Sequence, residues 1–344
     1  MMKINNLKVV EKFKYFIAVP IAILITGIII LFTPLGMNVG IDFAGGAIVK
    51  FDLGDYAATH QDVKLDLKDD IISKLEESGF SVSSDRWSGD DSTVLELGLL
   101  LSLDGQKIDL SDSAQQSNFK ERIEGTEENN YEDGLKVAIE NLVLASNEGF
   151  DEVGFEYNFV GASAEKLLKN ALWATAVAVV IMLIYIMIRF TVSSGISAVI
   201  CLTHDVLMML ALTTIFQIQV NTTFIAAVIT IIGYSINATI VIFDRIREIS
   251  ALSSMKDKTD KEIANKAVKD TLSRTILTTI TTMTTITILA IVCSLMGVTT
   301  MEEFALPIIF GLIAGTFSSI LLAPSVWVFL KKLGTKISKP KKAK

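Results

Sequence analysis

Residues 233–248 read Gly-Tyr-Ser-Ile-Asn-Ala-Thr-Ile-Val-Ile-Phe-Asp-Arg-Ile-Arg-Glu, and they carry one amide, Asn237, into an otherwise apolar segment. The segment 222–243 is long enough to cross a bilayer core of about 30 Å. It ends in a cluster of charges that must lie in water, so Asn237 lies inside the membrane. A polar group at that depth usually faces a helix bundle or a pathway rather than lipid.

Composition and length predict a membrane protein with six spans. Apolar residues make up 51% of the chain, which is rare for a soluble protein of this length. The segments that pass the length test are 15–32, 171–190, 196–216, 222–243, 275–296 and 304–330. We expect the first to remain in the mature protein as a span, and the last to tilt or to bend at Pro324.

The distribution of charge predicts the orientation. Of the 31 Lys and Arg residues, 20 lie in the segments 1–14, 189–195, 244–274 and 331–344, which the positive-inside rule places in the cytoplasm. The segment 36–170 holds 28 acidic and 11 basic residues, a net charge of −17, and is expected outside. The basic tail 331–344 is expected to touch membrane lipid rather than a nucleic acid.

The outer segment 36–170 is expected to form a separate α+β domain. Its pattern predicts strands at 46–53, 80–86, 93–101 and 153–160 and helices at 62–78 and 131–147. The order β-α-β-β-α-β is that of a ferredoxin-like sandwich. The predicted fold is therefore a mainly α-helical polytopic membrane protein. One span (15–35) precedes the extracytoplasmic domain, and five spans (171–330, with a cytoplasmic loop at 244–274) follow it.

Few residues of the chain suit catalysis or metal binding. It has two His and two Cys, and it lacks a P-loop, a Gly-x-Ser-x-Gly elbow and a His-Glu-x-x-His pattern. We expect no enzymatic activity, no metal and no cofactor. Four polar groups stand out instead: His204 and Asp205 in the third span, Asn237 in the fourth, and Arg274 where the fifth begins. They form either helix–helix hydrogen bonds or a proton or ion relay.

Short motifs along nearly the whole chain resemble the SecF family, the smaller membrane subunits of SecD–SecF pairs that assist protein export. Besides the His204-Asp205 pair, the matching residues are Gly40, Asp42, Phe43, Gly45, Gly46, Gly233, Tyr234, Ser235, Asp244 and Arg245. The resemblance implies a membrane fold of the RND (resistance-nodulation-division) superfamily with a SecD partner and the SecYEG channel. A YajC-like subunit, an unfolded translocating polypeptide and use of the proton-motive force are also implied.

One departure from this family concerns the proton path. The residue after the Asn of Gly-Tyr-Ser-x-Asn is commonly Asp in the family, where it is regarded as part of that path, and here it is Ala238. Arg274 matches the family's Arg at the start of the fifth span. Three explanations remain open: the relay runs through carboxylates of SecD, it uses Asp205 and water, or the chain acts mainly as a scaffold.

Two other classes of protein share parts of this pattern. An RND-type exporter of lipid or drug has the same layout of one span, a domain and five spans, but it normally carries two such units and larger outer domains. A membrane sensor with a ligand-binding outer domain would need a cytoplasmic output module. The length of the chain disfavours the first, and no such module is encoded for the second.

The orientation is testable by the accessibility of introduced cysteines. We expect an impermeant thiol reagent to label Ser113→Cys in intact cells, because residue 113 lies in the outer segment. Ser254→Cys, in the segment 244–274, should stay unlabelled until the cells are opened. The opposite pattern would overturn the orientation.

Overall fold

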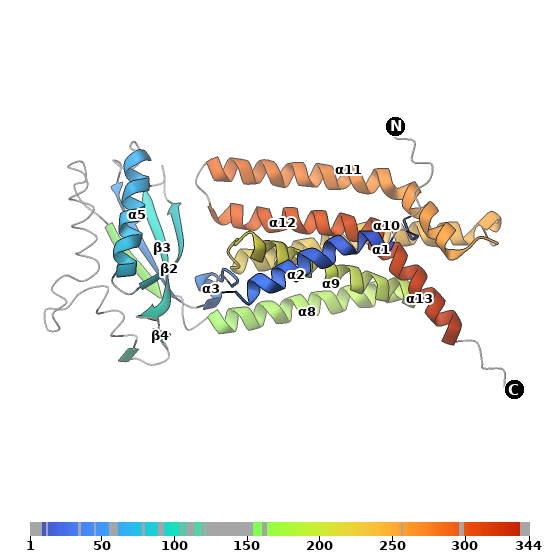
Figure 1. The fold of residues 1–344 in the computed structure, drawn as a ribbon, viewed down its shortest axis with the longest axis horizontal. Coiled ribbons are helices and arrows are strands. Elements are labelled where there is room, and N and C mark those ends of the chain that lie inside the picture. The colour runs from blue at the N-terminus through green and yellow to red at the C-terminus, as the bar shows by residue number, and fades with distance from the viewer. Residues whose placement is uncertain are drawn as a thin grey trace.

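A small β-sheet lies at one end of a long bundle of helices, and α1 and the end of α13 lie at the other (Figure 1). The computed structural model describes residues 9–11, 13–33, 36–44, 46–54, 61–77, 80–88, 93–103, 106–107, 114–115, 117, 121, 154–159, 164–255, 257–295 and 299–337. The sheet domain and the helix bundle are described in turn below.

Five helical segments in the described part of the chain are long and apolar enough to cross a membrane. They are α8 (Ala164–Arg189), α9 (Val192–Ile215), α10 (Thr222–Ala251), α11 (Asp260–Leu295) and the run of α12 (Thr299–Phe317), a π-helical turn (Ser318–Leu322) and α13 (Ala323–Ile337). The last run is bent, as expected, and the bend lies in the π-helical turn directly before Pro324. A proline has no N–H to continue an α-helical ladder.

The first expected span is formed by two short helices that follow each other directly. These are α1 (Phe13–Phe16) and α2 (Ala18–Leu31). The Ile17 N–H donates to the Phe13 carbonyl and the Ile21 N–H to the Ile17 carbonyl, so the helical hydrogen bonding continues through the junction. A run from Phe13 to Leu31 is about 28 Å long. α2 alone is shorter than the five other candidate spans. A membrane span at this first position, which would bring the total to six, therefore stays a prediction.

The sheet domain has the strand order of the predicted sandwich. Its elements are β1 (Gly46–Asp52), α5 (Gln61–Glu77), β2 (Phe80–Ser88), β3 (Val94–Leu103), β4 (Gln106–Lys107) and β5 (Gly154–Phe159). The sheet order is β2-β3-β1-β5 with antiparallel neighbours, so the first and last strands pair as in a split β-α-β arrangement. The predicted second helix, 131–147, lies outside the described residues.

Alternation along the central strands buries one face of this sheet. The fully buried residues of β1 and β3 are Ala47, Val49, Phe51, Leu95, Leu97 and Leu99. α5 lies across the sheet (Figure 1) and buries Leu67, Ile71 and Leu75 at helical spacing. Buried residues recur at every second position along the strands and at every fourth position along α5. These two periods are the patterns from which the strands and the helix were predicted.

The segment that leaves α2 docks on the connection between α9 and α10. Val39 and Val220 form a parallel bridge, the Gly40 N–H donates to the Val220 carbonyl (2.9 Å), and the Val220 N–H donates to the Asn38 carbonyl (2.8 Å). A Cβ on Gly40 would lie 3.1 Å from the Cβ of Asn221, so glycine is needed for this approach. The segment that leads into the sheet domain is thereby joined to the start of α10.

The expected cytoplasmic loop 244–274 is mostly helical, which corrects the sequence interpretation. α10 continues to Ala251 and α11 begins at Asp260, with only a 3₁₀ turn (Ser253–Met255) described as helical between them. Apolar residues continue at helical spacing beyond the expected span ends and are buried; they are Ile246, Ile249, Ile263, Ala264, Ala267 and Val268. The two helices therefore form a hairpin that extends past the bundle (Figure 1).

Signals for the start of α11 were present in the sequence and were missed. The Thr259 N–H donates to the Glu262 carboxylate (2.9 Å), and the Glu262 N–H donates to the Thr259 hydroxyl (3.4 Å). This reciprocal pair is a capping box, which satisfies two backbone donors at a helix start.

The centre of the bundle is a close contact between α10 and α12. A Cβ on Gly311 would lie only 2.4 Å from the Cγ1 of Ile231, whose side chain is fully buried. A Cβ on Gly315 would lie 3.3 Å from the Cβ of Ser235. Gly311 and Gly315 therefore form a seam within the chain, where small residues let two helix backbones approach.

We expect Gly311→Ala to destabilise the isolated chain by about 1–3 kcal/mol, because the added methyl group overlaps Ile231 in a packed core. The measurement is the melting temperature in a fixed detergent. Gly233→Ala is a matched control, since a Cβ at Gly233 meets nothing within 4 Å of it in this chain. Equal losses in the two variants would show that the seam is not what matters.

Candidate functional site

A fully buried carboxylate, Asp205, lies in the middle of α9. Its Oδ2 accepts hydrogen bonds from the hydroxyls of Ser235 on α10 and Ser318 in the π-helical turn, the latter at 2.8 Å. Its Oδ1 lies 2.9 Å from Nδ1 of His204. An ionised carboxylate only accepts hydrogen bonds, so the two hydroxyl donors fit the charged form, and the His204 tautomer with a proton on Nδ1 would add a third. The expected burial of Asp205 is confirmed.

His204 completes this cluster from the same helix. Its side chain is 12% exposed and stacks on Phe317, with ring centroids 6.1 Å apart. A proton on Nδ1 would donate to Asp205, and Nε2 can then accept a hydrogen bond in the neutral ring or donate one in the charged ring. Among the described residues, Nε2 is buried and has no hydrogen-bond partner. The pair can therefore take up a proton at Nε2 or on the carboxylate without breaking all of its other hydrogen bonds.

A chain of hydroxyl groups crosses three helices. The Tyr234 hydroxyl donates to the Thr279 hydroxyl of α11 (2.9 Å), and that hydroxyl lies 2.9 Å from the one of Thr316 on α12. Thr279 and Thr316 also bond to carbonyls of their own helices, at Thr275 and Leu312. These contacts tie α11, most of whose surface is exposed, to the rest of the bundle.

Other threonines of α11 bond within their own helix. Hydroxyls that donate to carbonyls three or four residues earlier belong to Thr278, Thr281, Thr282, Thr284 and Thr285. These hydroxyls donate to carbonyl oxygens of α11, and the surface of α11 that carries them is polar.

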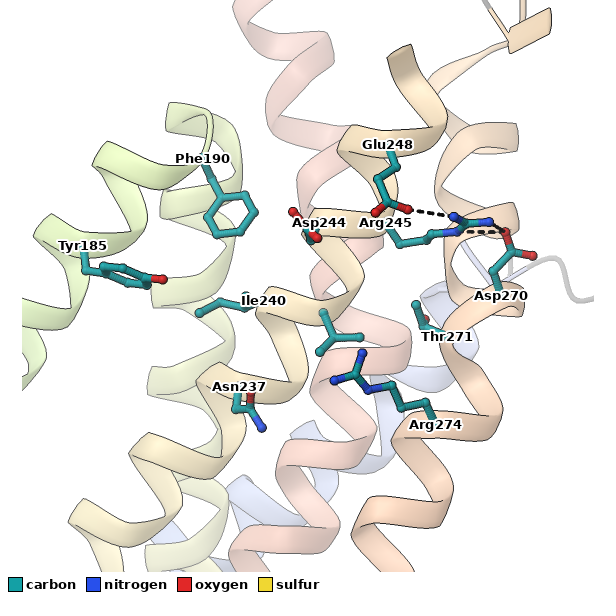
Figure 2. A pocket seen from close by; sticks show the side chains of 11 residues that line it. Tyr185, Phe190, Asn237, Ile240, Asp244, Arg245, Glu248, Asp270, Thr271 and Arg274 are labelled. Carbon is teal, nitrogen blue, oxygen red and sulfur yellow. Dashed lines mark hydrogen bonds and ion pairs between the residues drawn. The ribbon is translucent and has the colours of Figure 1, made fainter. Parts of the chain in front are cut away.

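A second polar region is an open pocket of about 530 Å³ near the end of the bundle away from the sheet. Figure 2 shows that α8, α10 and α11 supply its lining. The residues that line it are Tyr185, Phe190, Asn237, Ile240, Val241, Asp244, Arg245, Glu248, Asp270, Thr271 and Arg274. It mixes two guanidinium groups with three carboxylates.

Arg245 joins α10 to α11 on one side of this pocket. Its Nε and Nη2 donate to Asp270 (3.0 and 2.6 Å), and its Nη1 donates to Glu248 (2.7 Å). Its side chain is 38% exposed, so solvent weakens these ion pairs. The motif residue Arg245 thus has a structural partner on each helix.

Asn237 and Arg274 point into the same pocket from facing helices (Figure 2). Both residues are exposed, and neither side chain has a hydrogen-bond partner among the described residues. The described residues therefore supply no helix–helix hydrogen bond to Asn237, and its role stays a prediction. The structure brings Asn237 and Arg274 together but places them apart from Asp205. Ala238, next to Asn237, is partly buried.

The remaining motif residues lie at the junction of the two domains and on α10. Asp42 and Phe43 lie in α3 (Ile41–Ala44), Gly46 opens β1, and Gly45 lies outside the described residues. The side chain of Phe43 packs against the bundle core.

Sequence reasoning missed Ser318 and did not give Ser235 its role. The available signal was polar residues at Ser318 and Ser319 in an apolar run shortly before Pro324.

Comparison with known proteins agrees with this architecture. Residues 143–333 match the family described as "Protein export membrane protein SecD/SecF, C-terminal". The chain is 30% identical over 302 residues to the protein translocase subunit SecF of Rhodobacter capsulatus, covering 86% of this chain and 80% of that one. It is also 30% identical over 324 residues to the subunit SecDF of Bacillus subtilis, covering 93% of this chain and 38% of that longer one.

A solved structure has the same fold. The crystal structure of SecDF from Thermus thermophilus, described as a translocon-associated membrane protein, superposes with a TM-score of 0.66 at 24% identity. The match covers 96% of this chain and 40% of that one. The chain therefore belongs to the SecD/SecF family of protein-export membrane proteins, in its SecF branch.

Proposed function

We propose that this chain is an accessory subunit of the Sec translocase. It works with SecD and the SecYEG channel to promote proton-motive-force-dependent movement of unfolded polypeptides across the cytoplasmic membrane, and it has no enzymatic activity of its own. A YajC-like subunit and membrane lipid complete its proposed surroundings. Membership of the family supports the role in export, and the polar clusters between the helices support the coupling to protons.

The buried Asp205 cluster is the observation that carries the proton coupling. An ionised carboxylate within a membrane bundle is costly, and such groups mark ion or proton pathways. Protonation of Asp205 or His204 would change the charge of the cluster and the direction of its hydrogen bonds. Asp205 is therefore the proposed proton acceptor of this subunit, in place of the carboxylate that Ala238 lacks.

The SecD partner is proposed to cover the face of α10 and α11 that carries Asn237 and Arg274. Polar groups that lack partners inside this chain are costly against lipid, and another helix can supply hydrogen bonds or a carboxylate there. SecD and SecF regions lie in one chain in the Bacillus relative, which supports a lasting association.

The proposed orientation follows the charge distribution. The segment 36–170 is placed outside the membrane, with 1–14 and 331–344 in the cytoplasm. The hairpin of α10 and α11 then enters the cytoplasm. Figure 1 supports a single outer face, since the sheet and the hairpin lie at opposite ends of the bundle.

We expect Asp205→Asn to reduce export driven by a proton gradient to about the level without a gradient. The amide keeps the shape and part of the hydrogen bonding but binds no proton at neutral pH, so the free energy of unfolding should change by no more than about 2 kcal/mol. The measurement is export into vesicles that contain SecD and the variant, with and without an imposed gradient.

Two further variants control this experiment. Asp257→Asn makes the same chemical change at an exposed position and should respond like the parent. Ala238→Asp should be tolerated, because Arg274 offers a partner for the new charge. Full response in Asp205→Asn would rule out Asp205 as the essential carrier and would move the relay to SecD.

Purification with SecD should raise the melting temperature of the chain, because the partner supplies contacts for the exposed polar face. Arg274→Leu should reduce this difference, whereas Lys258→Leu, at an exposed position on the hairpin, should not. The measurement compares thermal unfolding at fixed detergent and concentration. An equal melting temperature with and without SecD would argue against the proposed interface.

A further inference from the structure

The last membrane run is interrupted at its bend by a π-helical turn, Ser318–Leu322. Such turns are rare and are frequent at functional sites. Hydroxyl groups compensate for the altered hydrogen bonding of the backbone: Ser197 of α9 donates to the Ala323 carbonyl (2.8 Å), and Ser325 donates to the Leu321 carbonyl (2.8 Å). The bend is thus a built feature of the bundle.

Ser318 opens this turn and is fully buried. Its Oγ lies 2.8 Å from Oδ2 of Asp205 and 3.2 Å from the carbonyl oxygen of Gly315. A hydroxyl group has one proton to donate, so it bonds strongly to only one of these acceptors at a time. A charged carboxylate is the stronger acceptor, and a protonated one is not.

The surroundings of Asp205 make this choice sensitive to one proton. The titratable side chains next to it are His204 and Cys201, both on its own helix. The elements that face Asp205 present uncharged groups. These are the Ser235 hydroxyl from α10, Gly315 near the end of α12, and the Ser318 hydroxyl from the π-helical turn. The hydroxyls can turn, whereas the position of the carboxylate is fixed by packing.

α13, the helix that follows the bend, contacts the hairpin of α10 and α11. Lys331 of α13 pairs with Asp260 at the start of α11 (2.5 Å), and its ammonium group lies 4.8 Å from the ring centroid of Trp327. A change of the bend would therefore move α13 relative to the hairpin, which projects beyond the bundle (Figure 1).

We propose that Ser318 is a positioning residue for Asp205 and that the π-helical turn is a hinge that responds to the protonation of this carboxylate. With Asp205 charged, the Ser318 hydroxyl ties the turn to α9. With Asp205 protonated, that hydroxyl turns to the Gly315 carbonyl, the tie is released, and α13 changes its angle. This inference rests on the proposed proton uptake by Asp205 and adds the element that responds to it.

The test measures the distance between spin labels at Ser254→Cys in the hairpin and Leu333→Cys on α13, as a function of pH. Both positions are exposed, Cys201 is fully buried, and Cys293 is replaced by Ser. The full chain is measured together with SecD in lipid nanodiscs. The readout does not depend on export activity.

Four variants separate a hinge from a merely structural contact. The parent distance should change with pH, and Asp205→Asn and Ser318→Ala should abolish the change. Ser235→Ala removes a donor that lies outside the turn and should keep the change. In the part of the chain that the structure describes, the Ser319 hydroxyl donates to the Thr316 carbonyl (3.1 Å) and not to Asp205, so Ser319→Ala should behave like the parent.

A parent distance that does not change with pH would overturn the hinge, and so would a Ser318→Ala variant that keeps the parent response. If Ser318→Ala does not fold, Ser318→Thr retains the hydroxyl and should keep the pH-dependent change. A loss of that change in the folded Thr variant would count against the inference. The proposed function fails separately, if Asp205→Asn still exports in full response to a proton gradient.

Discussion

The cost of burying one carboxylate between membrane helices determines how the rest of this bundle is built. Moving a charged side chain out of water without partners costs at least a few kcal/mol, and Asp205 is fully buried. Its donors come from positions 204, 235 and 318, which are far apart in the sequence. They meet because glycines let α12 approach α10, with Gly311 against Ile231 and Gly315 near Ser235. Packing and the polar cluster therefore depend on each other.

α10 has two faces with different partners. Ser235 and Thr239 are buried toward the bundle, whereas Gly233 and Asn237 are exposed. Positions four residues apart share a helix face, and positions two apart differ by about 200°. Within the family motif, Ser235 therefore contacts the interior of this chain, whereas Asn237 lies on its surface. A single chain satisfies only the first face, which is the physical argument for a partner.

The sequence was enough to predict what depends on composition and period. A charge inside an apolar run identified Asp205, and alternation identified β1 and β3, whose order in the sheet agrees with the predicted sandwich. Prediction from the sequence failed where a helix continues beyond the apolar part that crosses the membrane. The predicted spans end at the first charged residues, although buried Ile263 and Ala267 continue the helical period of α11. The π-helical turn was missed because a backbone hydrogen-bond register leaves no clear pattern in the residue types.

The position of α10 also constrains how the two polar regions could work together. Ser235 faces Asp205 on one side, and Asn237 faces Arg274 across the open pocket on the other. With Ala238 in place of a carboxylate, this helix offers no acidic side chain between the two regions at that level. Protonation of Asp205 would then change the surroundings of Arg274 through a displacement of α10, or through a partner's side chains. Direct transfer along side chains of α10 does not fit this arrangement. Coupling through a shared helix requires only that its two faces cannot move independently, and α10 is one continuous α-helix from Thr222 to Ala251.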